Sequence, residues 1–152
     1  MEMRVLVANG PNLDILGTRE PEVYGTATLS DIEVLLRNWL KRKGVDVSLE
    51  FFQTNSEGEL ISKLNSSHGK YAGLIINPGA LSHYSLALLD SLKAFPARKV
   101  ELHISNPLAR GGDRSRLLTA EAMDAVFLGV GAQGYVYALS YILASEGLLI
   151  EV

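Results

Sequence analysis

Short apolar runs recur along the chain and are separated by longer segments in which the apolar residues have a different spacing. Residues 3–8 and 72–76 are almost continuously apolar, whereas residues 45–52 and 99–104 carry polar residues at alternating positions. Continuous runs of this length are typical of strands that are covered on both faces, as in a parallel sheet. With a further run at residues 125–130, the pattern predicts five strands.

Segments with helical spacing lie between the expected strands and after the last one. Their apolar and capping residues predict helices at about residues 28–43, 56–67, 83–95 and 133–145. Thr28 or Ser30 is expected to cap the first helix. Ser56 and Glu59 have the spacing of a capping box at the start of the second helix. Pro96 ends the third helix, because proline cannot continue a helical hydrogen-bond ladder.

This alternation predicts an α/β fold, a flavodoxin-like three-layer α/β/α sandwich with a five-stranded parallel sheet. The chain has 152 residues without a low-complexity linker or a fixed-period repeat, so we expect a single domain over residues 1–152. A chain of this length buries roughly 70% of its unfolded surface, which suffices for a core without disulfides or a metal. The expected strand order rests on analogy.

Composition narrows the class of protein. The absence of cysteine excludes disulfides, thiolate chemistry and zinc sites built on sulfur. A net charge of −3 gives no electrostatic reason to expect nucleic acid or an anionic membrane as a partner. The apolar stretches are of strand length, and nothing resembles a signal peptide or a membrane span. We therefore expect a soluble cytoplasmic protein.

Three polar clusters follow expected strands. They are Asn9 to Asn12 with Arg19 to Gly25, then Asn77 to Ala80 with His83, and finally Glu101 to Asn106. In open parallel sheets, ligands bind beyond the carboxyl ends of the strands, so these clusters should converge on one site. Residues 13–27 have little regular periodicity, and loops longer than about 12–15 residues are commonly lids, binding loops or disordered segments. We interpret this loop as a lid.

The first cluster contains a candidate base, Tyr24. A phenol acts as a base only when ionised, and its ordinary pKa of about 10 disfavours this near neutrality. A guanidinium at about 4 Å contributes about 4 kcal/mol at an effective dielectric near 20, before desolvation is subtracted. Arg19 could therefore activate Tyr24. The alternative is an ordinary surface contact in which the arginine stacks on the ring.

The other two clusters supply a candidate anion cradle and a candidate acid. Gly79 permits close backbone approach, and the N–H groups after it can face an anion, although an ordinary turn has the same composition. Glu101 and His103 are two residues apart, so on a strand they share one face, and the carboxylate can orient the imidazole as a proton donor. The alternative is a buried structural pair. His83 is expected to begin the helix at residues 83–95.

Several further groups could hold a substrate. The backbone of Ile104 and Ser105, with the serine hydroxyl, could bind a carboxylate, and Arg110 and Arg114 follow in a glycine-containing loop. No cluster contains lysine, which an imine mechanism would need as nucleophile. Residues 129–134 match the dinucleotide pattern G-x-G-x-x-G, but they belong to the last strand and helix. We therefore expect no nicotinamide cofactor there and interpret these glycines as packing residues.

The ordered motifs resemble the type II 3-dehydroquinate dehydratases of the shikimate and quinate pathways. The likeness extends from about Val5 to Ala144. Its motifs are NGPN, REPxxYG, Gln53-Thr54-Asn55 followed by Glu57-Gly58, INPGA with SH, HISN, and Gly134-Tyr135. The resemblance implies a flavodoxin-like fold, a dodecamer built from trimers, and an enzyme that uses no metal or organic cofactor.

The resemblance also implies roles for individual residues. Tyr24 would remove the proton beside the substrate ketone, with its pKa lowered by Arg19, and His103, paired with Glu101, would protonate the departing hydroxyl. The remaining roles would be enolate stabilisation through an ordered water by Asn12 and Asn77, carboxylate binding by Ile104 and Ser105, ring-hydroxyl binding by His83 and Arg114, and contact with a neighbouring subunit's site by Asp90.

Two departures from the family pattern leave an alternative open. Leu89 stands where arginine is common before Asp90, and residues 111–113 and 115–117 differ from the usual segments around Arg114. These changes concern subunit contacts and substrate affinity. The alternative to a dehydratase is a non-catalytic or altered-substrate paralogue that binds a small cyclic carboxylate. Such a protein would not need Tyr24, Arg19 and His103 together.

Overall fold

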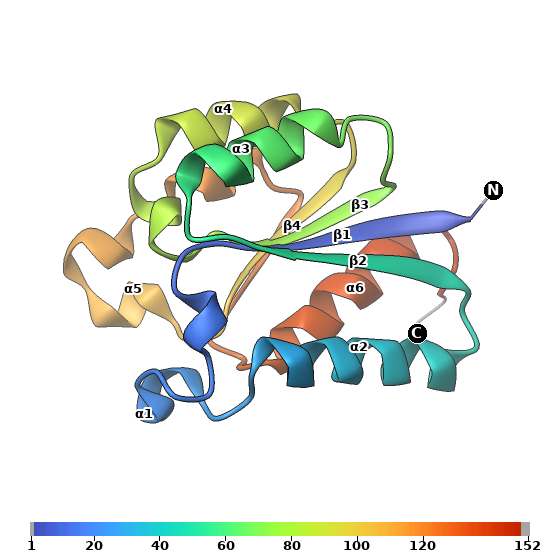
Figure 1. Ribbon diagram of the computed structural model, residues 1–152, viewed down its shortest axis with the longest axis horizontal. Helices are drawn as coiled ribbons and strands as arrows, with labels where there is room; N and C mark the ends of the chain where they lie inside the picture. The colour runs from blue at the N-terminus through green and yellow to red at the C-terminus, as the bar shows by residue number, and fades with distance from the viewer. Residues whose placement is uncertain (1, 150–152) are drawn as a thin grey trace.

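A parallel five-stranded sheet forms the centre of the molecule (Figure 1). The computed structural model describes residues 2–149. The strand order is β2-β1-β3-β4-β5, the order of flavodoxin-like sheets. The strands are β1 (Met3–Asn9), β2 (Val47–Gln53), β3 (Gly73–Asn77), β4 (Arg98–His103) and β5 (Ala125–Leu128).

Helices cover both faces of the sheet. The helices α3 (Glu57–Ser66) and α4 (Leu86–Ala94) lie on one face, whereas α2 (Leu29–Lys43) and α6 (Gln133–Ser145) lie on the other, as Figure 1 shows. Each pair of helices encloses its own cluster of buried apolar side chains against the sheet. The prediction of a three-layer sandwich is therefore confirmed.

Burial follows the position of each strand in the sheet. Every residue of β3 is buried, and β1 is buried from Val5 onward, because both strands have neighbours on either side and helices above and below. The strands β2 and β5 lie at the edges and are mostly half-buried. Continuous apolar runs thus coincide with the two most buried strands, β1 and β3, whereas the alternating pattern occurs both at the edge of the sheet, in β2, and inside it, in β4.

Local hydrogen bonds explain where the helices begin. Thr28 caps α2 with a full capping box shared with Asp31, as one of the two expected caps. Ser56 accepts a hydrogen bond from the backbone N–H of Glu59, but the expected capping box is incomplete. The Glu59 carboxylate instead accepts a hydrogen bond from the hydroxyl of Thr54, at 2.5 Å.

The prediction that His83 begins a helix is wrong. A 3-10 helix, η2 (Gly79–His83), ends at that residue, and α4 begins at Leu86 with Ser85 as its cap. The chain must first turn away from the end of β3, and a tight 3-10 turn does this before a second cap starts the α-helix.

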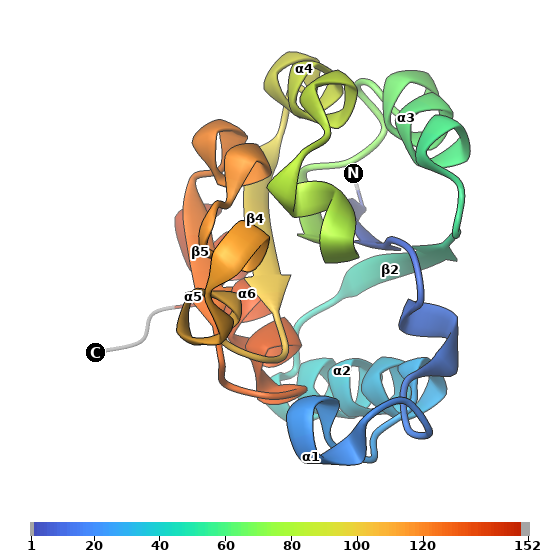
Figure 2. The same cartoon turned by 90° about the vertical axis from the view of Figure 1, so that its left-hand side faces the viewer.

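The segments that follow β1 and β4 contain short helices, although their sequences show little regular periodicity. Residues 13–27 contain a 3-10 turn, η1 (Leu13–Ile15), and the short helix α1 (Pro21–Tyr24). The long loop after β4 contains α5 (Pro107–Arg110), η3 (Gly112–Ser115) and η4 (Leu118–Ala122). Figure 2 shows α1 and α5 extending from the same end of the sheet.

Two glycines let the loops after β1 and β3 pack backbone against backbone. The N–H of Gly10 donates to the carbonyl of Asn77 at 2.8 Å. A Cβ atom at Gly10 would lie 2.6 Å from the Pro78 carbonyl oxygen. A Cβ atom at Gly79, whose φ is +60°, would lie 2.9 Å from the Pro11 carbonyl oxygen. No side chain fits at either place, so the backbones of the two loops are in direct contact.

Candidate active site

A cavity lies beyond the carboxyl ends of the strands and brings all three polar clusters together. The cavity is small, with a volume of about 40 Å³. Its lining includes the predicted site residues Asn12, Arg19, Tyr24, Asn77, His83, His103, Ile104, Ser105 and Arg114, together with Arg110. Residues at the ends of β1, β3 and β4 and in the segments that follow them thus surround one space.

Tyr24 ends the short helix α1 and is contacted by two guanidinium groups. The Arg19 guanidinium carbon lies 4.5 Å from the centre of the Tyr24 ring, a cation–π contact with the ring face. The Tyr24 hydroxyl instead accepts a hydrogen bond from Nη1 of Arg110, at 3.0 Å. Sequence analysis placed Arg110 near the site but did not foresee its contact with the candidate base.

Arg110 also connects the base to the expected carboxylate site. The same Nη1 atom donates to the hydroxyl of Ser105 at 3.1 Å. Arg110 ends α5, whose cap is Asn106, and a proline at the first helical position fits this start. The guanidinium therefore spans the loop after β4 and the loop that carries Tyr24, and it adds positive charge between them.

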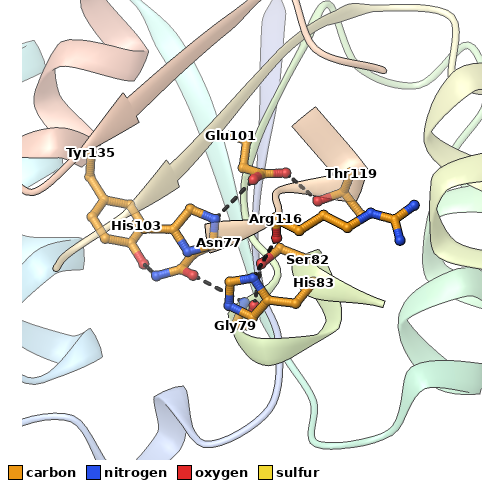
Figure 3. A network of polar contacts seen from close by, with 9 residues as sticks. All are labelled: Asn77, Gly79, Ser82, His83, Glu101, His103, Arg116, Thr119 and Tyr135. Atoms are coloured by element: carbon orange, nitrogen blue, oxygen red, sulfur yellow. Dashed lines mark hydrogen bonds and ion pairs between the residues drawn. The ribbon is translucent and has the colours of Figure 1, made fainter. Parts of the chain in front are cut away.

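A buried carboxylate orients the candidate acid. The ring atom Nε2 of His103 lies 2.8 Å from one oxygen of Glu101, and the hydroxyl of Thr119 donates to the other oxygen (Figure 3). Glu101 and Thr119 are fully buried, while His103 is 7% exposed and lines the cavity. The carboxylate is thus fixed from behind and presents the imidazole to the cavity, as the spacing of two on a strand predicted.

His83 lies beside this pair. Its Nδ1 atom is 2.7 Å from the backbone carbonyl oxygen of Arg116, which can only accept, so Nδ1 carries a proton. The neutral ring then has an unprotonated Nε2. The rings of His83 and His103 stack with centroids 6.3 Å apart. Both histidines line the cavity, and Figure 3 shows their rings near one another.

The two asparagines of the site are held by different contacts. The side-chain oxygen of Asn77 accepts from the N–H of Gly79 at 3.1 Å, and its amide nitrogen lies 3.5 Å from the hydroxyl of Tyr135. Asn12 has a left-handed backbone with φ of 68°, and its N–H donates to the side chain of Asn55 at 2.8 Å. Asn55 in turn donates to Asp14 at 3.1 Å.

Some predicted residues lie outside the cavity. Asp90 is exposed on α4 and is absent from the lining, and Glu101 lies behind His103 rather than at the surface of the cavity. Leu89, beside Asp90, is buried at 3% exposure. Within residues 2–149, no group of three or more His, Cys, Asp or Glu side chains is arranged to hold a metal ion.

Sequence reasoning did not assign roles to two residues that support the site. Thr119 binds Glu101 from a 3-10 turn 18 residues later in the chain. Asn55 was noticed only as part of a motif, although it fixes the backbone of Asn12. Both residues act through contacts between loops, for which the sequence carries no periodic signal.

No helix in residues 2–149 is long and apolar enough to cross a membrane.

Comparison with known proteins agrees with this architecture. Residues 3–143 match the family described as dehydroquinase class II. The 3-dehydroquinate dehydratase of Bartonella tribocorum is 47% identical over 142 residues, covering 93% of this chain and 94% of that protein. The corresponding protein of Thermotoga neapolitana is 46% identical over 140 residues, covering 92% and 94%.

Solved structures give the same result. The crystal structure of type II dehydroquinase from Butyrivibrio crossotus superposes with a TM-score of 0.87 at 34% identity, covering 93% of this chain and 97% of that one. A 3-dehydroquinate dehydratase-like protein from Bifidobacterium longum superposes less closely, with a TM-score of 0.69 at 26% identity, covering 95% and 98%. From its sequence and its structure, the chain belongs to the class II dehydroquinase family.

Proposed function

We propose that this protein is a hydro-lyase that removes water from 3-dehydroquinate to give 3-dehydroshikimate, in the shikimate or quinate pathway. The reaction would be an anti elimination through an enolate. The observation that carries the proposal is the convergence of Tyr24 and the Glu101-bound His103 on one cavity. An elimination through an enolate needs a base and an acid in one site, and it needs donors for the enolate oxygen between them.

In the first step, Tyr24 as phenolate takes a proton from the carbon beside the ketone. The electron pair of the broken C–H bond forms the enolate, and the phenol becomes neutral. The hydrogen bond from Arg110 and the guanidinium of Arg19 over the ring place two cations beside the phenol that would act as the base. This contact with two cations supports the base assignment over an ordinary surface stacking contact.

The enolate oxygen would be stabilised from the floor of the cavity. Asn12 and Asn77 line the cavity at the ends of η1 and β3, respectively, and an ordered water held by them would donate to the oxygen. Removing one donor of this kind typically costs about 10²–10³ in rate. The interlocked loops at Gly10 and Gly79 keep the two asparagines on one rigid support.

In the second step, the enolate collapses and the C–O bond of the leaving hydroxyl breaks. His103 as imidazolium transfers its proton to that hydroxyl, which leaves as water, and the electron pair of the enolate forms the new C=C bond. Glu101 stabilises the imidazolium through the 2.8 Å contact. Transfer of the proton from Tyr24 back to His103 through solvent restores both groups.

The remaining residues would hold the substrate. The backbone of Ile104 and the backbone and hydroxyl of Ser105 would bind the carboxylate. His83 and Arg114 would bind ring hydroxyls, and all four residues line the cavity. Residues 13–27 would close over the substrate as a lid.

Assembly is part of the same proposal. We propose a dodecamer built from trimers, in which the exposed Asp90 reaches the site of a neighbouring subunit. Light scattering on the purified protein tests the number of subunits, and a monomer would contradict this part of the proposal without affecting the chemistry.

Mixing the purified protein with 3-dehydroquinate tests the function directly. We expect ultraviolet absorbance from the conjugated product. Tyr24→Phe is expected to abolish turnover while ligand binding, followed by calorimetry, is largely retained. Undiminished turnover by Tyr24→Phe would refute the base assignment. Absence of product with the unaltered protein would favour the alternative, a paralogue that binds a small cyclic carboxylate without dehydrating it.

A further inference from the structure

Tyr135 is the largest wholly buried side chain of the molecule's described part, and the proposed chemistry does not use it. It lies in the first turn of α6, within the apolar cluster between the sheet and the helices α2 and α6. Burial raises the pKa of its hydroxyl far above the ordinary value, so the phenol stays neutral and keeps its proton. A hydroxyl in such surroundings must use its hydrogen-bonding capacity on nearby polar groups.

The partners of this hydroxyl are two asparagines at the ends of adjacent strands. Tyr135 donates its single proton to the side-chain oxygen of Asn9, at the end of β1. Toward Asn77, at the end of β3, the phenol oxygen can therefore only accept, and the amide nitrogen of Asn77 faces it at 3.5 Å. Asn9 and Asn77 are themselves 2% and 3% exposed.

A second contact requires the same orientation of the Asn77 amide. The backbone N–H of Gly79 can only donate, and it donates to the side-chain oxygen of Asn77 at 3.1 Å. Figure 3 shows Asn77 between Tyr135 on one side and Gly79 on the other. The amide oxygen thus accepts from Gly79, and one amide hydrogen points toward Tyr135. Neither contact uses the second amide hydrogen, so Asn77, which lines the cavity, keeps a donor that it can present there.

We propose that Tyr135 is a positioning residue that fixes the Asn77 side chain so that it presents a hydrogen-bond donor to the cavity. This inference rests on the proposed function, in which Asn77 helps hold an enolate. The proton donated to Asn9 is an essential part of it. If that proton were free, the phenol could donate to Asn77 instead, and only the Gly79 N–H would still disfavour the opposite orientation of the amide.

The main test is Tyr135→Phe, which removes only the hydroxyl oxygen. We expect kcat to fall about 10-fold, because the Asn77 amide loses one of its two orienting contacts, while KM stays within about twofold. Tyr137→Phe is the matched control. Tyr137 lies on the same helix but is 44% exposed and packs against Phe127, so its kinetics should equal those of the unaltered protein.

A second variant tests the role of the proton. Asn9→Leu removes the acceptor of the Tyr135 proton and is expected to lower kcat in the same direction. Because both changes act through one contact, the double variant should lose little more activity than the more impaired single variant. Additive losses in the double variant would mean that Tyr135 and Asn9 act independently, which would overturn the inference.

A spectroscopic measurement separates positioning from simple stability and does not depend on activity. In protein labelled with ¹⁵N-asparagine, Asn77→Asp identifies the side-chain amide signals of Asn77. Tyr135→Phe is expected to shift these signals, and Tyr137→Phe is not. Unshifted Asn77 signals in Tyr135→Phe would overturn the inference. Full activity of Tyr135→Phe alongside active unaltered protein would do the same, since it would reduce Tyr135 to a packing residue.

The failure of this inference is distinct from that of the proposed function. If the unaltered protein forms no product from 3-dehydroquinate, the proposed function fails, and the amide signals still decide whether Tyr135 orients Asn77. If the unaltered protein is active, the kinetics and the signals must change together in Tyr135→Phe for the inference to hold.

Discussion

Two carboxylates of the sheet, on strands separated by β1 and β3, have opposite environments. Glu50, on the edge strand β2, is 37% exposed and contacts Nζ of Lys63 at 2.7 Å, Nη2 of Arg4 at 3.6 Å and the hydroxyl of Tyr71. Glu101, on β4, is fully buried and is bound by a threonine hydroxyl and by His103. One carboxylate thus faces permanent cations and solvent, whereas the other faces a histidine.

This difference indicates that the charged groups around Glu50 have a structural role and that Glu101 and its partners have a functional one. The hydrogen bond from Lys63 is the main reason that the pKa of Glu50 is lowered, and the same bond raises the pKa of Lys63. Neither group changes its charge near neutral pH, so this cluster can only hold the fold together. The partner of Glu101 is instead the imidazole of His103, which lines the cavity and can act as a proton donor there.

Between these two clusters, the largest effect is expected from Glu101→Gln. Without the carboxylate, the imidazolium of His103 loses its charge partner, and kcat should fall about 10²–10³-fold. Steady-state kinetics with 3-dehydroquinate measure this change. The matched control is Glu50→Gln, the same substitution in the other cluster, with unchanged kcat. Equal losses in the two variants would remove the distinction between the clusters.

A smaller effect is expected from Thr119→Val, which has nearly the same shape but no hydroxyl. One oxygen of the buried Glu101 would lose its donor, which costs about 1–3 kcal/mol of folding free energy. The carboxylate would also be held less firmly, and we expect kcat to fall about 10-fold. Urea unfolding and kinetics measure the two quantities. Thr119→Ser keeps the hydroxyl and should recover most of the activity.

Glu50→Gln is expected to change only stability, and only slightly. Its partners are partly solvent-exposed, and exposed ion pairs contribute about 0–1 kcal/mol. Urea unfolding at pH 7 should therefore give a loss of less than about 1 kcal/mol. A loss of several kcal/mol would show that this cluster is as essential to the fold as the buried one.

The contribution of Glu50 to stability should also depend on pH. The folded pKa of Glu50 lies below its ordinary value of 4.5, so its stabilising effect is present above this value and is lost as pH falls through the folded pKa. The difference in unfolding free energy between the unaltered protein and Glu50→Gln should be constant from about pH 5 to 8 and shrink in more acidic solution. A difference that grows below pH 4 would contradict the lowered pKa.

The sequence predicted the sheet and most helices because their signals are periodic. The strands β1 and β3 are nearly continuous apolar runs, and the last helix has the predicted bounds of residues 133–145. Glu101 and His103 were paired correctly because strand geometry places alternate residues on one face. The location of the cavity followed from the rule that ligands bind beyond the strand ends.

Other contacts could not be predicted from the sequence. Arg110 and Tyr24 are 86 residues apart, and both lie in short irregular elements whose relative positions depend on the whole fold. The expected capping box is incomplete because the Glu59 carboxylate accepts from the Thr54 hydroxyl, and the Ser56 N–H donates to that same hydroxyl. The start of α4 was misplaced because the glycine and proline that follow β3 also suit a 3-10 turn.

The interlocked glycines after β1 and β3 constrain how this architecture can diversify. A β-carbon at Gly10 or Gly79 would collide with a carbonyl oxygen of the opposite loop. Natural variants at either position would push the two segments apart and displace the asparagines that follow or precede them. We therefore expect related enzymes with new ligand preferences to differ in residues 13–27 and 107–117, while this pair of turns is inherited unchanged.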